Sequence, residues 1–234
     1  TIPRPILIKV SYWVRPIISW YLKGNTYTDP IDGKSFRKFL PYGYGEQRPN
    51  VLSPSTFSLE RHRLIWLYLK NETDFFSAPK KVLHIAPEQC FLKLFKKQKN
   101  LSYTSADLYS PIADVKADIC DFEVLQKVFH DNDIDTIIHF AAESHVDRSI
   151  TGPRDFINTN LIGTFNLLEA ARLCWEDKKD VLFHHISTDE VYGESMLDID
   201  EQHKTEHSIL CPTNPYAATK ASAELIAQSS LRSR

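Results

Sequence analysis

Two short clusters near the end of the chain carry residue types that can do acid–base chemistry. The first is Ser187-Thr188-Asp189-Glu190-Val191-Tyr192-Gly193, and the second, 26 residues after Glu190, is Tyr216-Ala217-Ala218-Thr219-Lys220. A Tyr and a Lys four residues apart on a helix lie on one face, one turn apart. Because a Lys ammonium beside a phenol favours the phenolate, the pair makes a base that can act near neutral pH.

The acid pair Asp189-Glu190 must be positioned by a strand. It follows an apolar run from Val181 to Ile186, which predicts a buried strand. Two carboxyls, an activated phenol and a hydroxyl at neighbouring strand and helix ends suit redox-assisted proton transfer on a sugar.

A third cluster, Ala141-Ala142-Glu143-Ser144-His145-Val146-Asp147-Arg148-Ser149-Ile150, lies upstream. A lone Tyr-x3-Lys pair is most often an ordinary helix surface, but all three clusters occur here in one order and spacing. In this respect residues 118–229 resemble the dTDP-glucose 4,6-dehydratases, which are NAD-dependent members of the extended short-chain dehydrogenase/reductase (epimerase/dehydratase) family.

The resemblance implies a lyase of nucleotide-sugar metabolism that converts dTDP-glucose to dTDP-4-keto-6-deoxyglucose and water, with NAD as cofactor. It implies that Tyr216 takes the proton of the sugar 4-hydroxyl, while Lys220 lowers the Tyr pKa and holds the nicotinamide ribose. Glu190 would remove the proton next to the new ketone. Asp189 would protonate the departing 6-hydroxyl, and Thr188 would bind the 4-oxygen. The residues implied to bind the cofactor are Asp107, Asp118, Ile119, Ala141, Ala142, Ser144, Thr159, Ser187, Tyr216 and Lys220.

The chain departs from this family in two places. It has seven glycines, and none lies between residues 46 and 151, where a glycine-rich strand-to-helix turn should hold the NAD pyrophosphate. It also stops at Arg234, before the later strands and the sugar-nucleotide lobe of the family. Both departures favour a chain that is inactive by itself.

The front part, about 20–121, resembles a different family, the bacterial SAM-dependent methyltransferases. The resemblance rests on four short runs: Lys38-Phe39-Leu40-Pro41-Tyr42-Gly43, Ser58-Leu59-Glu60-Arg61-His62-Arg63, Leu83-His84-Ile85-Ala86-Pro87-Glu88 and Ala106-Asp107-Leu108. It implies that Asp107, at the end of the second strand, holds the ribose of the methyl donor. A solvated strand-end acid is an equal alternative. The two resemblances meet near residues 117–121, so a hybrid with its junction there is expected.

The alternation of apolar runs predicts an α/β fold with a Rossmann-like, doubly wound parallel sheet of about five strands. We expect strands at 81–86, 101–107, 115–118, 136–141 and 181–187, in the order 3-2-1-4-5. Helices are expected at about 90–98, 122–131, 154–175 and 215–230, and the third should carry Phe156, Leu161, Phe165, Leu168 and Ala171 on one side. Residues 81–234 would form this domain. Residues 1–80 would be a loop-rich extension with one helix, at 58–70.

Composition narrows the class of protein. The net charge of −2 and the absence of basic runs give no case for nucleic acid, and four cysteines without CxxC spacing indicate a cytoplasmic protein with reduced thiols. Residues 1–22 are apolar and aromatic but contain three prolines and three cations, so we expect a poorly packed tail and no spanning segment, with contact to a membrane surface as the alternative. His203 and His207 lack a third ligand, so no metal is expected. The expected partner is a dTDP-sugar nucleotide, and a homodimer is left open.

Three functions therefore remain open from the sequence. They are the dTDP-glucose 4,6-dehydratase, a SAM-dependent methyltransferase fragment, and a non-catalytic hybrid fragment. The first has the most specific motifs.

Overall fold

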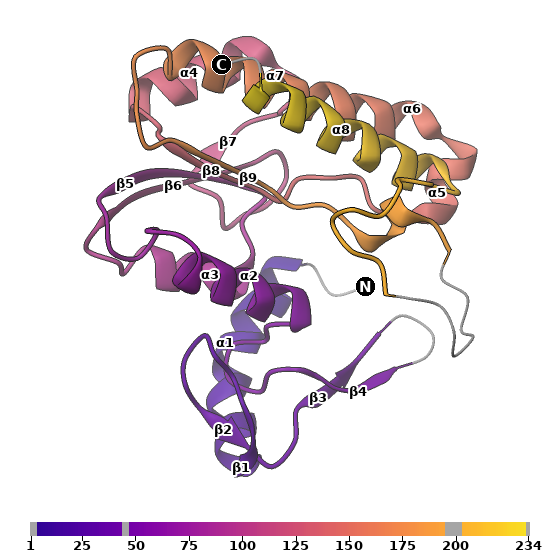
Figure 1. Cartoon of the computed structure of the whole chain (residues 1–234). Helices are drawn as coiled ribbons and strands as arrows, with labels where there is room; N and C mark the ends of the chain where they lie inside the picture. The colour runs from indigo at the N-terminus through magenta and orange to yellow at the C-terminus, as the bar shows by residue number, and fades with distance from the viewer. Residues whose placement is uncertain (1–3, 44–46, 195–202, 233–234) are drawn as a thin grey trace. The chain divides into compact units, whose positions relative to one another are not determined.

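The structure is a computed structural model that describes residues 4–43, 47–194 and 203–232 (Figure 1). The chain divides into two compact units. One comprises Thr1–Pro79 with Glu88–Leu101, and the other comprises Lys80–Pro87 with Ser102–Arg234.

The second unit is built on a five-stranded sheet. Its strands are β7 (Val115–Lys116), β6 (Leu101–Asp107), β5 (Lys80–Ile85), β8 (Thr136–His139) and β9 (Leu182–His185), in that spatial order. β5 pairs with β8 in parallel, from Val82 opposite Thr136 to Ile85 opposite His139, and β8 pairs with β9 in the same way. The predicted Rossmann-like fold and its 3-2-1-4-5 strand order are confirmed.

One hydrophobic core spans the two halves of the sequence. Leu83, Ile85 and Ala106 from the front strands pack with Leu125 and Leu167 from the rear helices, and all five are 0–2% exposed. β8 is buried at every position, as expected of a strand covered on both faces. The front strands therefore complete the sheet on which the rear motifs are mounted.

The helical segments of the second unit are α4 (Phe122–Asn132), α5 (Val146–Thr151), α6 (Pro153–Phe156), the π-helical segment η1 (Ile157–Gly163), α7 (Thr164–Cys174), the 3-10 turn η2 (Asp189–Tyr192) and α8 (Pro215–Arg232). Of these, the helices α4, α7 and α8 lie on one face of this sheet (Figure 1). Asp121 caps α4 by accepting a hydrogen bond from the Val124 amide, at 3.1 Å.

The expected regular helix over 154–175 is instead α6, η1 and α7 in succession. Phe165, which was expected on the same side as Phe156, is 47% exposed, whereas Phe156 is buried. The side of this helix that the structure buries consists of Phe156, Asn160, Gly163, Thr164, Leu167, Ala170 and Ala171.

Replacing Gly163 with Ala is expected to destabilise the second unit. A Cβ built on Gly163 lies 2.5 Å from Ile119 Cδ1 and 2.6 Å from its Cγ1, so the helix backbone and the Ile119 side chain must move apart. Overpacking of this kind costs roughly 1–3 kcal/mol, measurable by urea unfolding. Gly152→Ala is the matched control, because its added Cβ meets only the Arg148 carbonyl, at 3.7 Å. Combining Gly163→Ala with Ile119→Ala should cost less than the sum of the single changes, and simple additivity would contradict the clash.

The first unit contains more regular structure than the sequence led us to expect. Its elements are α1 (Arg4–Tyr21), β1 (Lys23–Thr28), β2 (Ser35–Phe36), β3 (Leu40–Tyr42), β4 (Arg48–Leu52), α2 (Glu60–Asn71) and α3 (Gln89–Phe95). α2 matches the helix predicted at 58–70, whereas α1 forms where a poorly packed tail was expected and continues through Pro16. Among the described residues, no helix has the length and apolar character needed to cross a membrane.

Candidate active site

The acid cluster and the Tyr/Lys cluster are joined where β9 ends and α8 begins. Lys220 Nζ donates a 2.6 Å hydrogen bond to the Ile186 carbonyl, just beyond β9. Asn214 Nδ2 donates a 3.0 Å hydrogen bond to Glu190 Oε2. These two bonds hold the first two turns of α8 against the segment that carries Asp189 and Glu190.

Tyr216 and Lys220 lie on one helix, as the sequence predicted. Asn214 begins α8 by accepting a 2.8 Å hydrogen bond from the Ala217 amide. Tyr216 is 8% exposed, and its ring meets Phe156 edge-on at 6.4 Å. The phenol is therefore held by packing in the first turn, one helical turn before the lysine.

Lys220 is a buried cation. Its side chain is almost completely enclosed, and burial lowers the pKa of its ammonium to about 8, with Glu224 opposing the shift. A positive charge that is poorly solvated is well placed to stabilise an anion such as a phenolate.

The acids sit on the 3-10 turn η2. The Thr188 hydroxyl accepts a hydrogen bond from the Glu190 amide and donates one to Asp189 Oδ1, both at 3.3 Å. Asp189 is exposed and Glu190 is half-buried. Thr188 therefore orients both acids, which face different degrees of solvation.

Two neutral histidines lie beneath this site in the sheet. His139 and His185 are paired across β8 and β9 with their rings 5.3 Å apart. Burial lowers the pKa of His139 well below its ordinary value and that of His185 to about 3, and the nearby Lys220 charge acts in the same direction. Lys220 is thus the positive charge of this region at neutral pH. The Ser187 hydroxyl above them is buried without a hydrogen-bond partner among the described residues.

Asn160, which the sequence analysis did not identify, organises the loop after β8. Its Oδ1 accepts from the Glu143 amide at 2.8 Å, while its Nδ2 donates to the Glu143 carbonyl and to Thr219 Oγ1, both at 3.0 Å. Thr219 in turn donates to the Tyr216 carbonyl, at 2.7 Å. Asn160 therefore links the loop that contains Ala141, Ala142 and Ser144 to the Tyr/Lys helix. The signal that could have identified Asn160 is a polar amide side chain at a position that the helical spacing places on the buried side.

Asn160→Ala is expected to lower the free energy of unfolding by about 1–3 kcal/mol, because the part-buried Glu143 amide and carbonyl lose their partner, while the Thr219 hydroxyl keeps its bond to the Tyr216 carbonyl. Chemical denaturation measures this loss. Asn158→Ala, at an exposed position of the same π-helical segment, is the matched control and should change stability by less than about 0.5 kcal/mol. Equal losses in the two variants would remove the organising role of Asn160.

The predicted cofactor acids are both engaged in local turns. Asp107 Oδ1 accepts hydrogen bonds from the amides of Tyr109 and Ser110, at 2.7 and 2.5 Å. Asp118 Oδ1 accepts one from the Cys120 amide, at 2.8 Å. Asp107 is the last residue of β6, and Asp118 lies two residues after the end of β7, so both are at the carboxyl edge of the sheet. The Oδ2 atom of each carboxylate takes no part in the turn bonds named above.

The other predicted cofactor residues lie on separate elements. Ile119 is buried against Gly163, and Thr159 is half-buried in η1. The loop after β8 has Ala141 and Ala142 half-buried and Ser144 exposed. No cluster of three potential metal ligands occurs within the described segments, which include His203 and His207.

The turn after β5 does not fit a dinucleotide pyrophosphate. Ala86 has φ +54°, a left-handed conformation that favours glycine, and its amide already donates to the Ala106 carbonyl at 2.9 Å. Pro87 has no amide to offer. Within the first unit, Glu88 Oε1 lies 3.3 Å from His62 Nε2 and 3.8 Å from an Arg61 guanidinium nitrogen. Its charge is therefore partly offset, and the missing amides are the stronger obstacle.

Known proteins resemble about half of this chain. The dTDP-glucose 4,6-dehydratase of Haemophilus influenzae is 48% identical over 118 residues, which cover 48% of this chain and 34% of that protein. The dTDP-glucose 4,6-dehydratase 1 of Escherichia coli K12 is 50% identical over 120 residues, covering 46% and 33%. The matched part thus spans about a third of the length of these relatives. A solved dTDP-glucose 4,6-dehydratase of Streptomyces venezuelae with NAD bound is 31% identical, with a TM-score of 0.50 over 64% of this chain and 51% of that one.

A family model also reaches into the front part. It is described as GDP-mannose 4,6 dehydratase and matches residues 91–233. These relatives give no support to the predicted methyltransferase resemblance of residues 20–121, and the family match already includes β6 and most of α3 from that stretch. Since the match extends over more than half of the sequence, the chain belongs to the GDP-mannose 4,6 dehydratase family.

Proposed function

We propose that the rear part of this chain forms the acid–base site of a dTDP-glucose 4,6-dehydratase. The observation that carries this proposal is the pair of hydrogen bonds from α8 to the strand-end segment, Lys220 to Ile186 and Asn214 to Glu190. They join a Tyr/Lys base to two carboxylates, and the relatives with that name support a dTDP-hexose as the substrate.

Tyr216 would remove the proton of the sugar 4-hydroxyl. The Lys220 ammonium, desolvated and held on the Ile186 carbonyl, stabilises the phenolate that this requires. NAD, when bound, supplies the hydride acceptor for this oxidation. Lys220 and the Ser187 hydroxyl, which lacks a partner among the described residues, suit its nicotinamide ribose.

The acids of η2 would complete the elimination of water. Oxidation at C4 acidifies the proton at C5, and Glu190 would remove it with Oε1, since Oε2 accepts from Asn214. Asp189, which is exposed and bonded to Thr188, would give a proton to the departing 6-hydroxyl. Return of the hydride to C6 and of the proton from Glu190 to C5 would then give the 4-keto-6-deoxy sugar, with no net consumption of NAD. Thr188 would hydrogen-bond the 4-oxygen.

The diphosphate end of NAD does not fit this chain, because the turn at Ala86 and Pro87 offers no free amides. We therefore propose weak NAD binding and no measurable turnover by the chain as it stands.

The test is a turn-restored variant with Ala86→Gly, Pro87→Ala and Glu88→Gly. With saturating NAD it should convert dTDP-glucose to the 4-keto-6-deoxy product, and Tyr216→Phe in that background should abolish product formation. Tyr109→Phe, at a residue 87% exposed, is the matched control and should retain it. A turn-restored variant that binds NAD and dTDP-glucose without oxidising the sugar would defeat the proposed function.

A further inference from the structure

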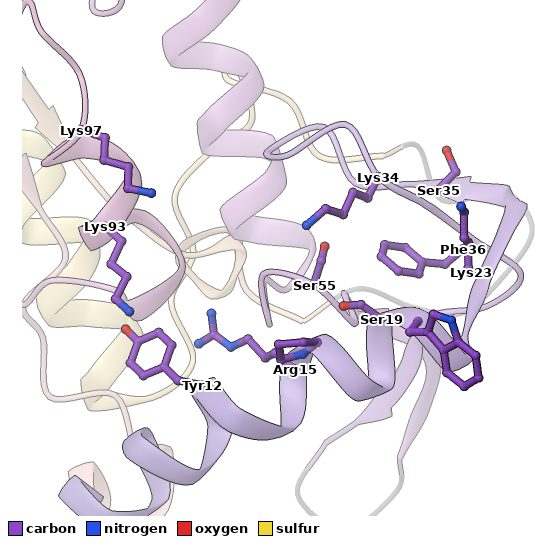
Figure 2. A pocket seen from close by; sticks show the side chains of 12 residues that line it. Tyr12, Arg15, Ser19, Lys23, Lys34, Ser35, Phe36, Ser55, Lys93 and Lys97 are labelled. Carbon is purple, nitrogen blue, oxygen red and sulfur yellow. The ribbon is translucent and has the colours of Figure 1, made fainter.

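The first unit contains a basic cavity that the dehydratase site does not use. The cavity has a volume of about 940 Å³ and lies along α1, β1, β2 and α3 (Figure 2). This volume is within the range of sites for small molecules. The residues that line it are Tyr12, Arg15, Pro16, Ser19, Trp20, Lys23, Lys34, Ser35, Phe36, Ser55, Lys93 and Lys97.

The charge of this lining is one-sided. Five of its twelve residues are cations, and no carboxylate is among them. Lys34 has an acidic neighbour, Asp32 at 3.1 Å, which lies outside the lining. Several like charges around one concave space raise the local concentration of anions.

Arg15 is the most constrained of these cations. Its guanidinium lies between the rings of Tyr12 and Phe57, 4.8 and 4.7 Å from their centroids. Its Nε and Nη2 atoms are buried without a hydrogen-bond acceptor among the described residues. Arg15 is half-buried, and this partial burial lowers the pKa of its guanidinium. A partly desolvated cation with unsatisfied donors is stabilised when an anion approaches it.

A second cation converges on the same ring. Lys93 Nζ lies 3.5 Å from the Tyr12 centroid, and Figure 2 shows the side chains of Arg15 and Lys93 both reaching this ring. Lys97 lies four residues after Lys93, in the turn that follows α3. Arg15, Lys93 and Lys97 thus place three positive charges on this cavity. Such a set matches a multiply charged anion better than a single carboxylate.

We propose that this cavity binds a phosphate-bearing ligand. Its oxygens would be held by Arg15, Lys93 and Lys97, with the aromatic side chains of Tyr12 and Trp20 beside the rest of the molecule. Arginine and lysine are the usual binders of phosphate, the first by its fork of donors and the second as a compact charge.

Two sources can supply such a phosphate: a soluble phosphate ester and the headgroup of an anionic phospholipid. The lipid is a candidate because an exposed apolar stripe on α1 borders the cavity. It consists of Val10, Trp13, Ile17 and Trp20, with exposed fractions of 50, 82, 67 and 78%. Aromatic and aliphatic residues at helical spacing beside cations are typical of helices that lie at a membrane surface.

The experiment compares the chain with Lys93→Gln/Lys97→Gln, two exposed positions that leave the core intact. Pyrophosphate is titrated by calorimetry, and vesicles of phosphatidylcholine alone or with phosphatidylglycerol are titrated by Trp fluorescence. Lys127→Gln/Lys179→Gln removes the same charge from exposed positions of the second unit and is the matched control. Arg15→Gln is added if circular dichroism shows that it folds.

We expect at least about tenfold weaker binding in Lys93→Gln/Lys97→Gln and less than about twofold change in the control. Pyrophosphate binding that is lost in this way identifies a soluble phosphate ester. Binding only to the anionic vesicles, lost in the same variant, identifies a phospholipid headgroup. No binding in either arm, or binding that the two double variants weaken equally, overturns the proposal.

Discussion

The chain as it stands is expected to show no saturable binding of NAD up to about 1 mM. The turn after β5 offers the pyrophosphate neither the Ala86 amide, which is bonded to Ala106, nor an amide at Pro87. Losing two charge-assisted hydrogen bonds costs roughly 3–6 kcal/mol, which weakens binding by a factor of at least about 100. Isothermal calorimetry with the purified chain and with the turn-restored variant measures the difference.

The matched control for this experiment is Ala86→Gly alone. It relieves the left-handed backbone at φ +54° and should raise stability by about 0.5–1 kcal/mol. It should not restore NAD binding, because Pro87 still lacks an amide. Micromolar affinity in the unchanged chain would show that the cofactor reaches the site without this turn.

The buried ammonium of Lys220 should make the stability of the protein rise with pH in the alkaline range. Its pKa is about 8 in the folded chain and 10.5 as the ordinary value, so between these limits the unfolded state binds more protons. The penalty of burying the charge is present in full below about pH 8 and is removed as the pH rises toward 10.5. The gain amounts to about 3 kcal/mol.

Urea unfolding at several pH values, for the chain and for Lys220→Met, isolates this contribution. Other alkaline titrations cancel in the difference, which should shift by about 3 kcal/mol in favour of the chain with lysine between pH 8 and 10.5. Lys127→Met, at an exposed position of α4, is the matched control and should give a curve parallel to that of the unchanged chain. A constant difference between the chain and Lys220→Met across this range would mean that Lys220 is solvated.

The sheet could be predicted because each of its strands is an apolar run between segments of helical periodicity. β8 is buried at all four positions, and its sequence Thr136-Ile137-Ile138-His139 has no polar face to expose. The joining of the two chemical clusters could also be predicted, since the carboxyl ends of parallel strands meet at one edge. That edge carries the segment with Glu190, and the Lys220 bond to Ile186 holds α8 there.

Other features had no sequence signal strong enough to identify them. The helical run through η1 and α7 buries Asn160, Gly163 and Thr164, which are polar or small. A pattern of apolar residues alone therefore did not identify the buried side, and it included Phe165, which is exposed. Asp107 was ambiguous because a turn-capping acid and a ribose-binding acid both follow a strand, and the structure shows its Oδ1 in the turn. α1 was missed because its three neighbouring or internal prolines argued against a helix, although the apolar spacing from Val10 to Trp20 is helical.

The central place of β5 in the sheet has a consequence for how the protein is made. β5 and β6 leave the ribosome first, and β5 has one edge without a partner until β8, about fifty residues later, has been synthesised. An unpaired edge of this kind is prone to association with other chains. A fragment that ends near residue 120 contains β5 but not β8, so the edge of β5 stays unpaired. A fragment that begins near residue 120 contains β8 but lacks β5, its partner. The strands before and after residue 120 therefore depend on one another for a complete sheet.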